Sequence, residues 1–158
     1  MPAITLMGWF HTICGILSIL IVLYVLFKYK LISFKQQLSK VYLFLTFITA
    51  FSSLLIYNQG GFGIAHFLGV LTLLAVIFGV LVEKTLMLGW ISKYFYTLCY
   101  TSTFLFHMIP AITDALRRLP ANDPIAKSFT DPIIMNFHIL FFVIYLFILI
   151  LQFRKIKG

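Results

Sequence analysis

Five long apolar stretches run along the chain, and short polar segments separate them. The stretches cover approximately residues 9–27, 41–57, 62–82, 94–113 and 133–153. Each comes close to the roughly 20 residues with which an α-helix crosses about 30 Å of hydrocarbon. The pattern predicts an all-α fold, a polytopic membrane bundle of five transmembrane helices that forms one integral-membrane domain over residues 1–158.

Composition strengthens this prediction and removes one class of partner. Hydrophobic residues make up 62% of the chain and charged residues 10%, and the mean hydropathy is +1.07. A soluble domain contains far less apolar sequence. The net charge of +8 could suggest nucleic acid, but the basic residues lie beside apolar stretches. We therefore expect no nucleic-acid partner, and we interpret the basic residues as topology signals and contacts with anionic lipid.

The distribution of basic residues predicts an orientation. Nine of the twelve lie in residues 28–40, 84–93 and 154–157, three segments that alternate onto one side of the membrane. On the opposite side Arg117, Arg118 and Lys127 are balanced by three aspartates. Because positive loops stay in the cytoplasm, we expect the N-terminus outside and the C-terminus in the cytoplasm of a multi-pass protein in the plasma (inner) membrane.

Four histidines are the most unusual polar residues of the apolar stretches: His11, His66, His107 and His138. With a helical rise of about 1.5 Å per residue, all four fall within roughly 3–10 Å of the outer boundary. Ionisable side chains are costly inside a membrane and indicate function by default. The shared depth predicts one site near the outer face.

Further polar residues follow His107 along its helix. Thr103, His107, Pro110, Asp114 and Arg117 recur at spacings of four and three, which places them on one helical face. Asp114 and Thr103 would orient a histidine from outside the ligand set. Arg117 would bind an anionic group such as a haem propionate. Alternatively, Asp114 pairs with an arginine one turn away.

Imidazole chemistry narrows the kind of site. Histidines on facing helices suit haem b, and copper or zinc is the alternative. A carboxylate-rich di-metal centre is excluded, because the sole glutamate, Glu83, lies at the opposite end and is expected to form a solvated pair with Lys84. In architecture and histidine content the chain is similar to small membrane cytochromes of the b561 type, His-ligated bundles that exchange electrons with quinol. Those cytochromes usually place haems in both leaflets, whereas these histidines gather in one.

Three functions follow, in order of preference. The first is a small membrane redox protein, an oxidoreductase or electron carrier that exchanges electrons with a quinol at the histidine site. The second is a non-catalytic accessory subunit of a larger membrane complex or homo-oligomer, whose histidines only hydrogen-bond neighbouring helices. The third is a proton-coupled carrier, which requires a polar path to the inner face. For that path the sequence offers only scattered serines and Thr46, Thr49, Thr101 and Thr103.

Overall fold

The computed structural model describes residues 4–57 and 61–158, and this part of the chain is helical without strands. The helices are α1 (Leu6–Tyr29), α2 (Gln37–Ser53), α3 (Ile64–Thr85), the 3₁₀ turn η1 (Gly89–Ile91), α4 (Ser92–Arg118) and α5 (Pro132–Lys157). The predicted all-α fold is confirmed, and each predicted apolar stretch corresponds to one α-helix.

The helix boundaries differ from the predicted ones by up to five residues, and two of these differences affect the histidine end. α2 ends at Ser53, where Ser52 and Ser53 donate back to the carbonyls of Thr49 and Ala50 and the chain turns. α4 continues to Arg118, five residues beyond the predicted end at residue 113. Apolar sequence indicates how far a helix can lie in hydrocarbon, but polar residues can continue the helix beyond that limit.

Among the helices of residues 4–57 and 61–158, only α1, α3 and α5 are long enough and apolar enough to cross a membrane by length and composition, where five such helices were predicted. α2 has 17 residues, and α4 carries many hydroxyl-bearing side chains. These polar residues are buried against other helices, among them Tyr42, Thr46, Thr101 and Thr103. The hydropathy of α2 and α4 is therefore lowered by side chains that face the interior of the bundle.

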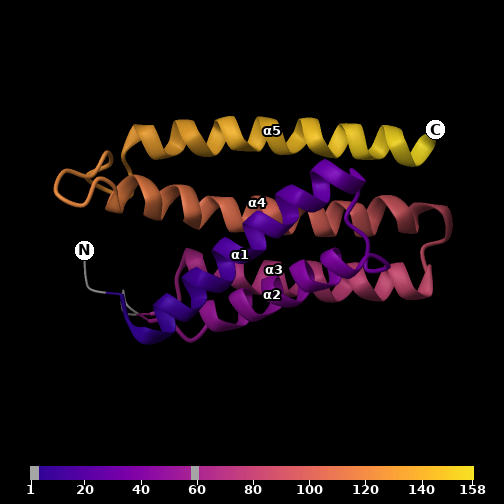
Figure 1. The fold of residues 1–158 in the computed structure, drawn as a ribbon, viewed down its shortest axis with the longest axis horizontal. Coiled ribbons are helices and arrows are strands. Elements are labelled where there is room, and N and C mark those ends of the chain that lie inside the picture. The colour runs from indigo at the N-terminus through magenta and orange to yellow at the C-terminus, as the bar shows by residue number, and fades with distance from the viewer. Residues whose placement is uncertain (1–3, 58–60) are drawn as a thin grey trace.

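Successive helices run antiparallel and pack side by side, while α1 also crosses α4 (Figure 1). The starts of α1, α3 and α5 lie at the same end as the ends of α2 and α4. We call this the histidine end. The opposite end holds residues 30–36, residues 86–91 and the end of α5, and we call it the lysine end.

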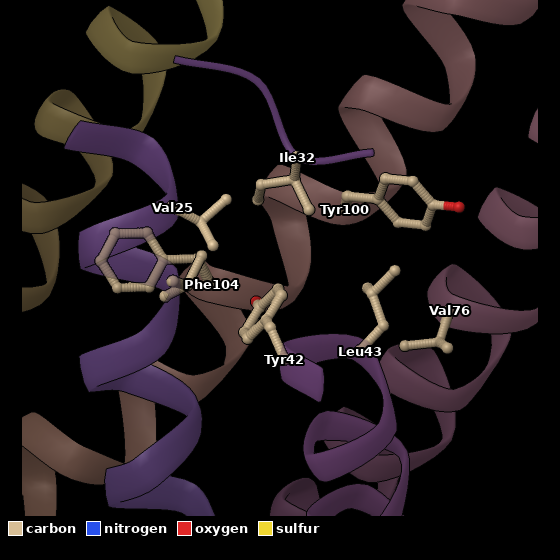
Figure 2. Close-up of a cluster of buried hydrophobic side chains, with 8 residues drawn as sticks. Val25, Ile32, Tyr42, Leu43, Val76, Tyr100 and Phe104 are labelled. Carbon is tan, nitrogen blue, oxygen red and sulfur yellow. The ribbon is translucent and has the colours of Figure 1, made fainter. Parts of the chain in front are cut away.

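An apolar cluster fills the space between α1, α2, α3 and α4 near the lysine end (Figure 2). Tyr42 and Leu43 of α2 meet Tyr100 and Phe104 of α4, and Ile32 of the α1–α2 connection covers them. All five are at most 2% exposed. The hydroxyl of Tyr100 points away from this cluster (Figure 2) and donates to Glu83.

Gly79 allows α3 to approach α4 closely at this cluster. A Cβ atom at Gly79 would lie 2.6 Å from Cε1 of Tyr100 and 3.2 Å from Cβ of Cys99. No carbon atom fits at such a separation without movement of the ring. The close contact fixes the level at which Tyr100 meets the last turns of α3.

Candidate functional site

Each of the four histidines forms a hydrogen bond at the histidine half of the bundle. Nδ1 of His11 donates to the carbonyl of Thr49 on α2 over 3.0 Å. Nε2 of His107 lies 3.0 Å from the hydroxyl of Thr46, and Nε2 of His138 donates to the carbonyl of Ile109 over 3.1 Å. Nδ1 of His66 accepts the N–H of Gly63 over 3.2 Å at the start of its own helix. Three of the four histidines thus join neighbouring helices.

The histidines lie in one half of the bundle but not at one depth. His107 lies eleven residues before Arg118, the last residue of α4, which corresponds to about 16 Å of helix. Its partner Thr46 lies seven residues before the end of α2. His107 is therefore near the middle of the bundle, because α4 extends further than its apolar stretch indicates.

The described residues do not bring the histidines into one ligand set. Within residues 4–57 and 61–158, no three His, Cys, Asp or Glu side chains lie close enough to hold one metal ion. His66 instead stacks between aromatic rings, with centroids 4.6 Å from Tyr57 and 5.2 Å from Phe62. The imidazoles of His11 and His107 lie within electrostatic range of each other. Haem b, copper and zinc stay predictions that a spectrum or metal analysis must test.

The residues expected to support the histidines have other contacts. Thr103 does not touch a histidine: its hydroxyl lies 2.6 Å from that of Tyr42. Asp114 is exposed and pairs with Arg118 at 3.7 Å, as the alternative interpretation predicted, and it also lies within electrostatic range of His11. The guanidinium of Arg117 stacks on Phe129, with Cζ 3.5 Å from the ring centroid.

The register of α2 against α4 explains why Asp114 is exposed while His107 is buried. Tyr42–Thr103 and Thr46–His107 both join residues 61 positions apart, so the two helices run in the same direction in constant register. In this register Ser53, the last residue of α2, is level with Asp114. The predicted polar face of α4 therefore leaves the interior where α2 ends.

A directed series of hydroxyl groups continues from His107 toward the lysine end of the bundle. Thr103 donates to the carbonyl of Tyr100 over 2.7 Å, so its oxygen accepts the proton of the Tyr42 hydroxyl. Thr46, whose hydroxyl contacts His107, follows Tyr42 by one turn on the same face of α2. Tyr42, Thr46 and Thr103 are fully buried.

Glu83 was expected to be a solvated partner of Lys84, and this expectation is wrong. The Glu83 side chain is buried, with 7% of the residue exposed. Its carboxylate accepts from the hydroxyl of Ser33 at 2.5 Å, the N–H of Phe34 at 2.8 Å and the hydroxyl of Tyr100 at 2.8 Å. The Lys84 ammonium lies instead over the ring of Phe34, 4.8 Å from its centroid. The α1–α2 connection folds over the end of α3, so the hydrogen-bond donors of Glu83 come from residues that are distant from it in the sequence.

These groups together form a polar series through the interior, which we call the polar file. Its members are His11, His107, Thr46, Tyr42, Thr103, Tyr100 and Glu83. It begins at His11, near the end of α2, and ends at the α1–α2 connection. The hydrogen bonds are interrupted between His11, which bonds Thr49 and Ser52, and His107, and again at the apolar ring of Tyr100 between its own carbonyl and its hydroxyl.

A second group of polar contacts holds α5 and lies outside the polar file. The hydroxyls of Ser102 and Tyr145 are 2.9 Å apart, and Thr101 donates to Gln152 over 2.6 Å. Gln152 also donates to the carbonyl of Lys30 over 3.1 Å, which joins α5 to the end of α1.

In the exposed α4–α5 connection, a hydrogen bond from Lys127 lowers the pKa of Asp123.

Sequence reasoning missed Tyr42, Tyr100 and Glu83. Tyr42 continues the Thr46–Thr49 spacing by one turn, and Tyr100 continues the Thr103–His107 spacing in the same way. Both extensions could have been found as helical faces. The contacts of Glu83 depend on the fold of the α1–α2 connection and leave no signal in the spacing.

Comparison with protein-family models, with curated proteins and with solved structures finds no match to this chain. The assignment of function therefore depends on the geometry of the polar file.

Proposed function

We propose that the protein is a small proton-coupled integral-membrane carrier that moves protons along the polar file. The observation that carries this proposal is the alignment of polar side chains along the interior, with His11 and His107 toward the histidine end, Tyr42, Thr46 and Thr103 between them and Tyr100, and Glu83 at the lysine end. A polar path to the inner face is the feature that the carrier hypothesis requires. In a membrane, chains of buried histidine and carboxylate side chains typically serve as proton relays.

The antiparallel packing supports five membrane crossings, although α2 and α4 are less apolar than the other helices. α1, α3 and α5 are apolar enough to cross, and all three start at the histidine end. Two helices that cross in the same direction require a segment that crosses back between them. α2 and α4 provide these return crossings, and their polar side chains avoid lipid by facing the interior.

The proposed orientation places the histidine end outside and the lysine end in the cytoplasm. Nine of the twelve basic residues lie at the lysine end or on the helix turns next to it. The positive-inside rule then supports a plasma (inner) membrane protein with an external N-terminus.

In the proposed transfer, His11 and His107 exchange protons with the outer surface beside Asp114. A proton accepted by His107 is passed to Thr46 and from there to Tyr42 and Thr103, each hydroxyl giving up one proton as it receives another. The proton that Thr103 gives up crosses to the Tyr100 hydroxyl, which passes its own proton to Glu83, and Glu83 releases a proton at the α1–α2 connection. The apolar interval at Tyr100 requires a water molecule or a movement of the ring, so we expect it to limit the rate.

The test is proton flux in vesicles that contain the purified full chain and a trapped pH dye. An imposed pH gradient should collapse faster than in protein-free vesicles. His107→Gln keeps an N–H donor for Thr46 but does not titrate, so the flux should fall to the protein-free level. His138→Gln, outside the polar file, is the matched control and should retain the flux. Equal flux in both variants, or none with the unmodified chain, would overturn the proposal.

The redox hypothesis gives a different result with the same sample. A haem b site that exchanges electrons with quinol produces a Soret band and a reduced-minus-oxidised difference spectrum, and copper or zinc appears in elemental analysis. The carrier proposal needs neither signal. A stoichiometric cofactor together with absent flux would favour the redox function.

One observation favours the accessory-subunit hypothesis as a second candidate. α5 buries only Ile134, Tyr145 and Gln152, so most of its apolar surface faces lipid or another chain. If this surface contacts a larger complex or a second copy, the purified chain should co-migrate with that partner in mild detergent. Alanine at His107 or His138 would then leave the activity of the complex unchanged.

A further inference from the structure

A hollow of about 320 Å³ opens at the lysine end, between the start of α4 and the end of α5. Its lining includes Leu86, Trp90, Lys93, Tyr94, Ile156 and Lys157. Two lysines, Lys93 and Lys157, therefore line one hollow together with aromatic and aliphatic residues. None of these residues belongs to the polar file.

The aromatic side of the hollow is held in place by edge-to-face contacts. The rings of Trp90 and Tyr94 lie 6.3 Å apart at 80°, and those of Tyr94 and Phe153 lie 5.3 Å apart at 81°. The first contact joins η1 to α4, and the second joins α4 to α5. The adjoining turn is shaped by left-handed backbone at Leu86 (φ 51°) and Gly89 (φ 58°) and by a hydrogen bond from the N–H of Leu88 to the hydroxyl of Ser92.

The charge of the hollow is not compensated within the described part of the chain. Lys28, Lys30, Lys40 and Lys84 each lie over an aromatic ring, whereas Lys93 and Lys157 have neither such a ring nor a carboxylate partner there. Glu83 is the one side-chain carboxylate of this end, and it already accepts three hydrogen bonds. The two lysines are therefore free to bind an anion.

We infer that this hollow is a binding site for the headgroup of an anionic phospholipid. The two ammonium groups match a phosphate, and the aliphatic and aromatic residues match the glycerol and the first part of the acyl chains. Tryptophan and tyrosine are typical of the membrane interface, where headgroups lie. Basic pockets between membrane helices on the cytoplasmic side bind anionic headgroups in this way. The site does not depend on the proposed proton transfer.

The test is the thermal stability of the full chain in uncharged detergent, titrated with phosphatidylglycerol, phosphatidylcholine or inorganic phosphate. Phosphatidylglycerol should raise the unfolding temperature of the unmodified chain in a saturable way. In Lys93→Gln/Lys157→Gln the apparent affinity should fall about 25-fold, since each lysine near an anionic headgroup contributes about a factor of five.

Lys35→Gln/Lys40→Gln removes the same charge from the same end but outside the hollow, and it should keep the affinity. Lys93→Arg/Lys157→Arg should also keep it, which confirms that the glutamine variant is not simply misfolded. Equal losses in the two glutamine variants would show a diffuse charge effect and overturn the site. Equal stabilisation by phosphatidylcholine, or by inorganic phosphate alone, would overturn it as well.

Discussion

At the scale of single residues, burial of a carboxylate requires donors that replace its water, and Glu83 has three. Ser33, Phe34 and Tyr100 all donate, and they come from two separate parts of the chain. An anionic acceptor with several donors is stable inside a protein, whereas loss of one partner leaves a buried polar group without a bond. Glu83 therefore holds the α1–α2 connection on the end of α3.

We predict that Glu83→Gln destabilises the protein. The amide offers a single oxygen to three donors, and its NH₂ group would face at least one of them. The free energy of unfolding should fall by about 1–3 kcal/mol, the usual cost of an unsatisfied buried group. Chemical denaturation in detergent, followed by circular dichroism, measures this change.

Asp123→Asn is the control for this prediction. Asp123 is exposed in the α4–α5 connection and pairs only with Lys127, and exposed pairs contribute little to stability. Equal unfolding curves for Glu83→Gln and the unmodified chain would show that the three hydrogen bonds are not needed to hold the connection.

At the scale of helices, the sequence predicted the number and order of the elements well but predicted their surroundings poorly. Apolar length identifies each helix, because hydrocarbon and a buried core favour the same residues. Apolar length cannot show that α2 and α4 lie side by side in constant register, with the hydroxyl groups of both helices in contact between them. His11 contacts Thr49, and His107 contacts Thr46. To predict these contacts, one must know the angle at which the helices pack and the residues at which they end, and hydropathy gives neither.

The close approach of α3 to α4 gives a prediction at this scale. In Gly79→Ala the new methyl group would lie 2.6 Å from the Tyr100 ring, which is fully buried and hydrogen-bonded to Glu83. Alanine in a helix normally stabilises it by about 0.5–1 kcal/mol relative to glycine. Here we expect a net destabilisation of about 1–2 kcal/mol, because overpacking costs about 1–3 kcal/mol.

Gly61→Ala provides the comparison, since a Cβ atom there has no heavy atom within 4 Å. Thermal unfolding in detergent should show a lower midpoint for Gly79→Ala and little change for Gly61→Ala. A stabilised Gly79→Ala protein would mean that α3 and α4 do not approach as closely as described.

At the scale of the whole molecule, the account requires five crossings with the two ends on opposite sides. We predict opposite labelling of single cysteines placed at the two ends, in a background with Cys14→Ala and Cys99→Ala. Ser128→Cys, in the α4–α5 connection, should react with an impermeant maleimide from outside the cell. Lys35→Cys, in the α1–α2 connection, should react only after permeabilisation.

Labelling of both cysteines from outside would contradict the five-crossing topology. Labelling of Lys35→Cys alone would keep the topology and reverse the orientation. Because the direction of proton transfer follows the orientation, this result decides which end of the polar file faces the cytoplasm.

The central claim is that the hydroxyls of the polar file carry protons, and one matched pair of variants tests it most directly. Tyr42→Phe and Tyr145→Phe each remove one buried hydroxyl that bonds a hydroxyl of α4, at Thr103 and at Ser102. Only Tyr42 belongs to the polar file. The measurement is the rate of pH-gradient collapse in vesicles with equal amounts of each folded variant. The account predicts that Tyr42→Phe falls to the rate of protein-free vesicles while Tyr145→Phe keeps the rate of the unmodified chain. Unchanged flux in Tyr42→Phe, or equal losses in both variants, would contradict it.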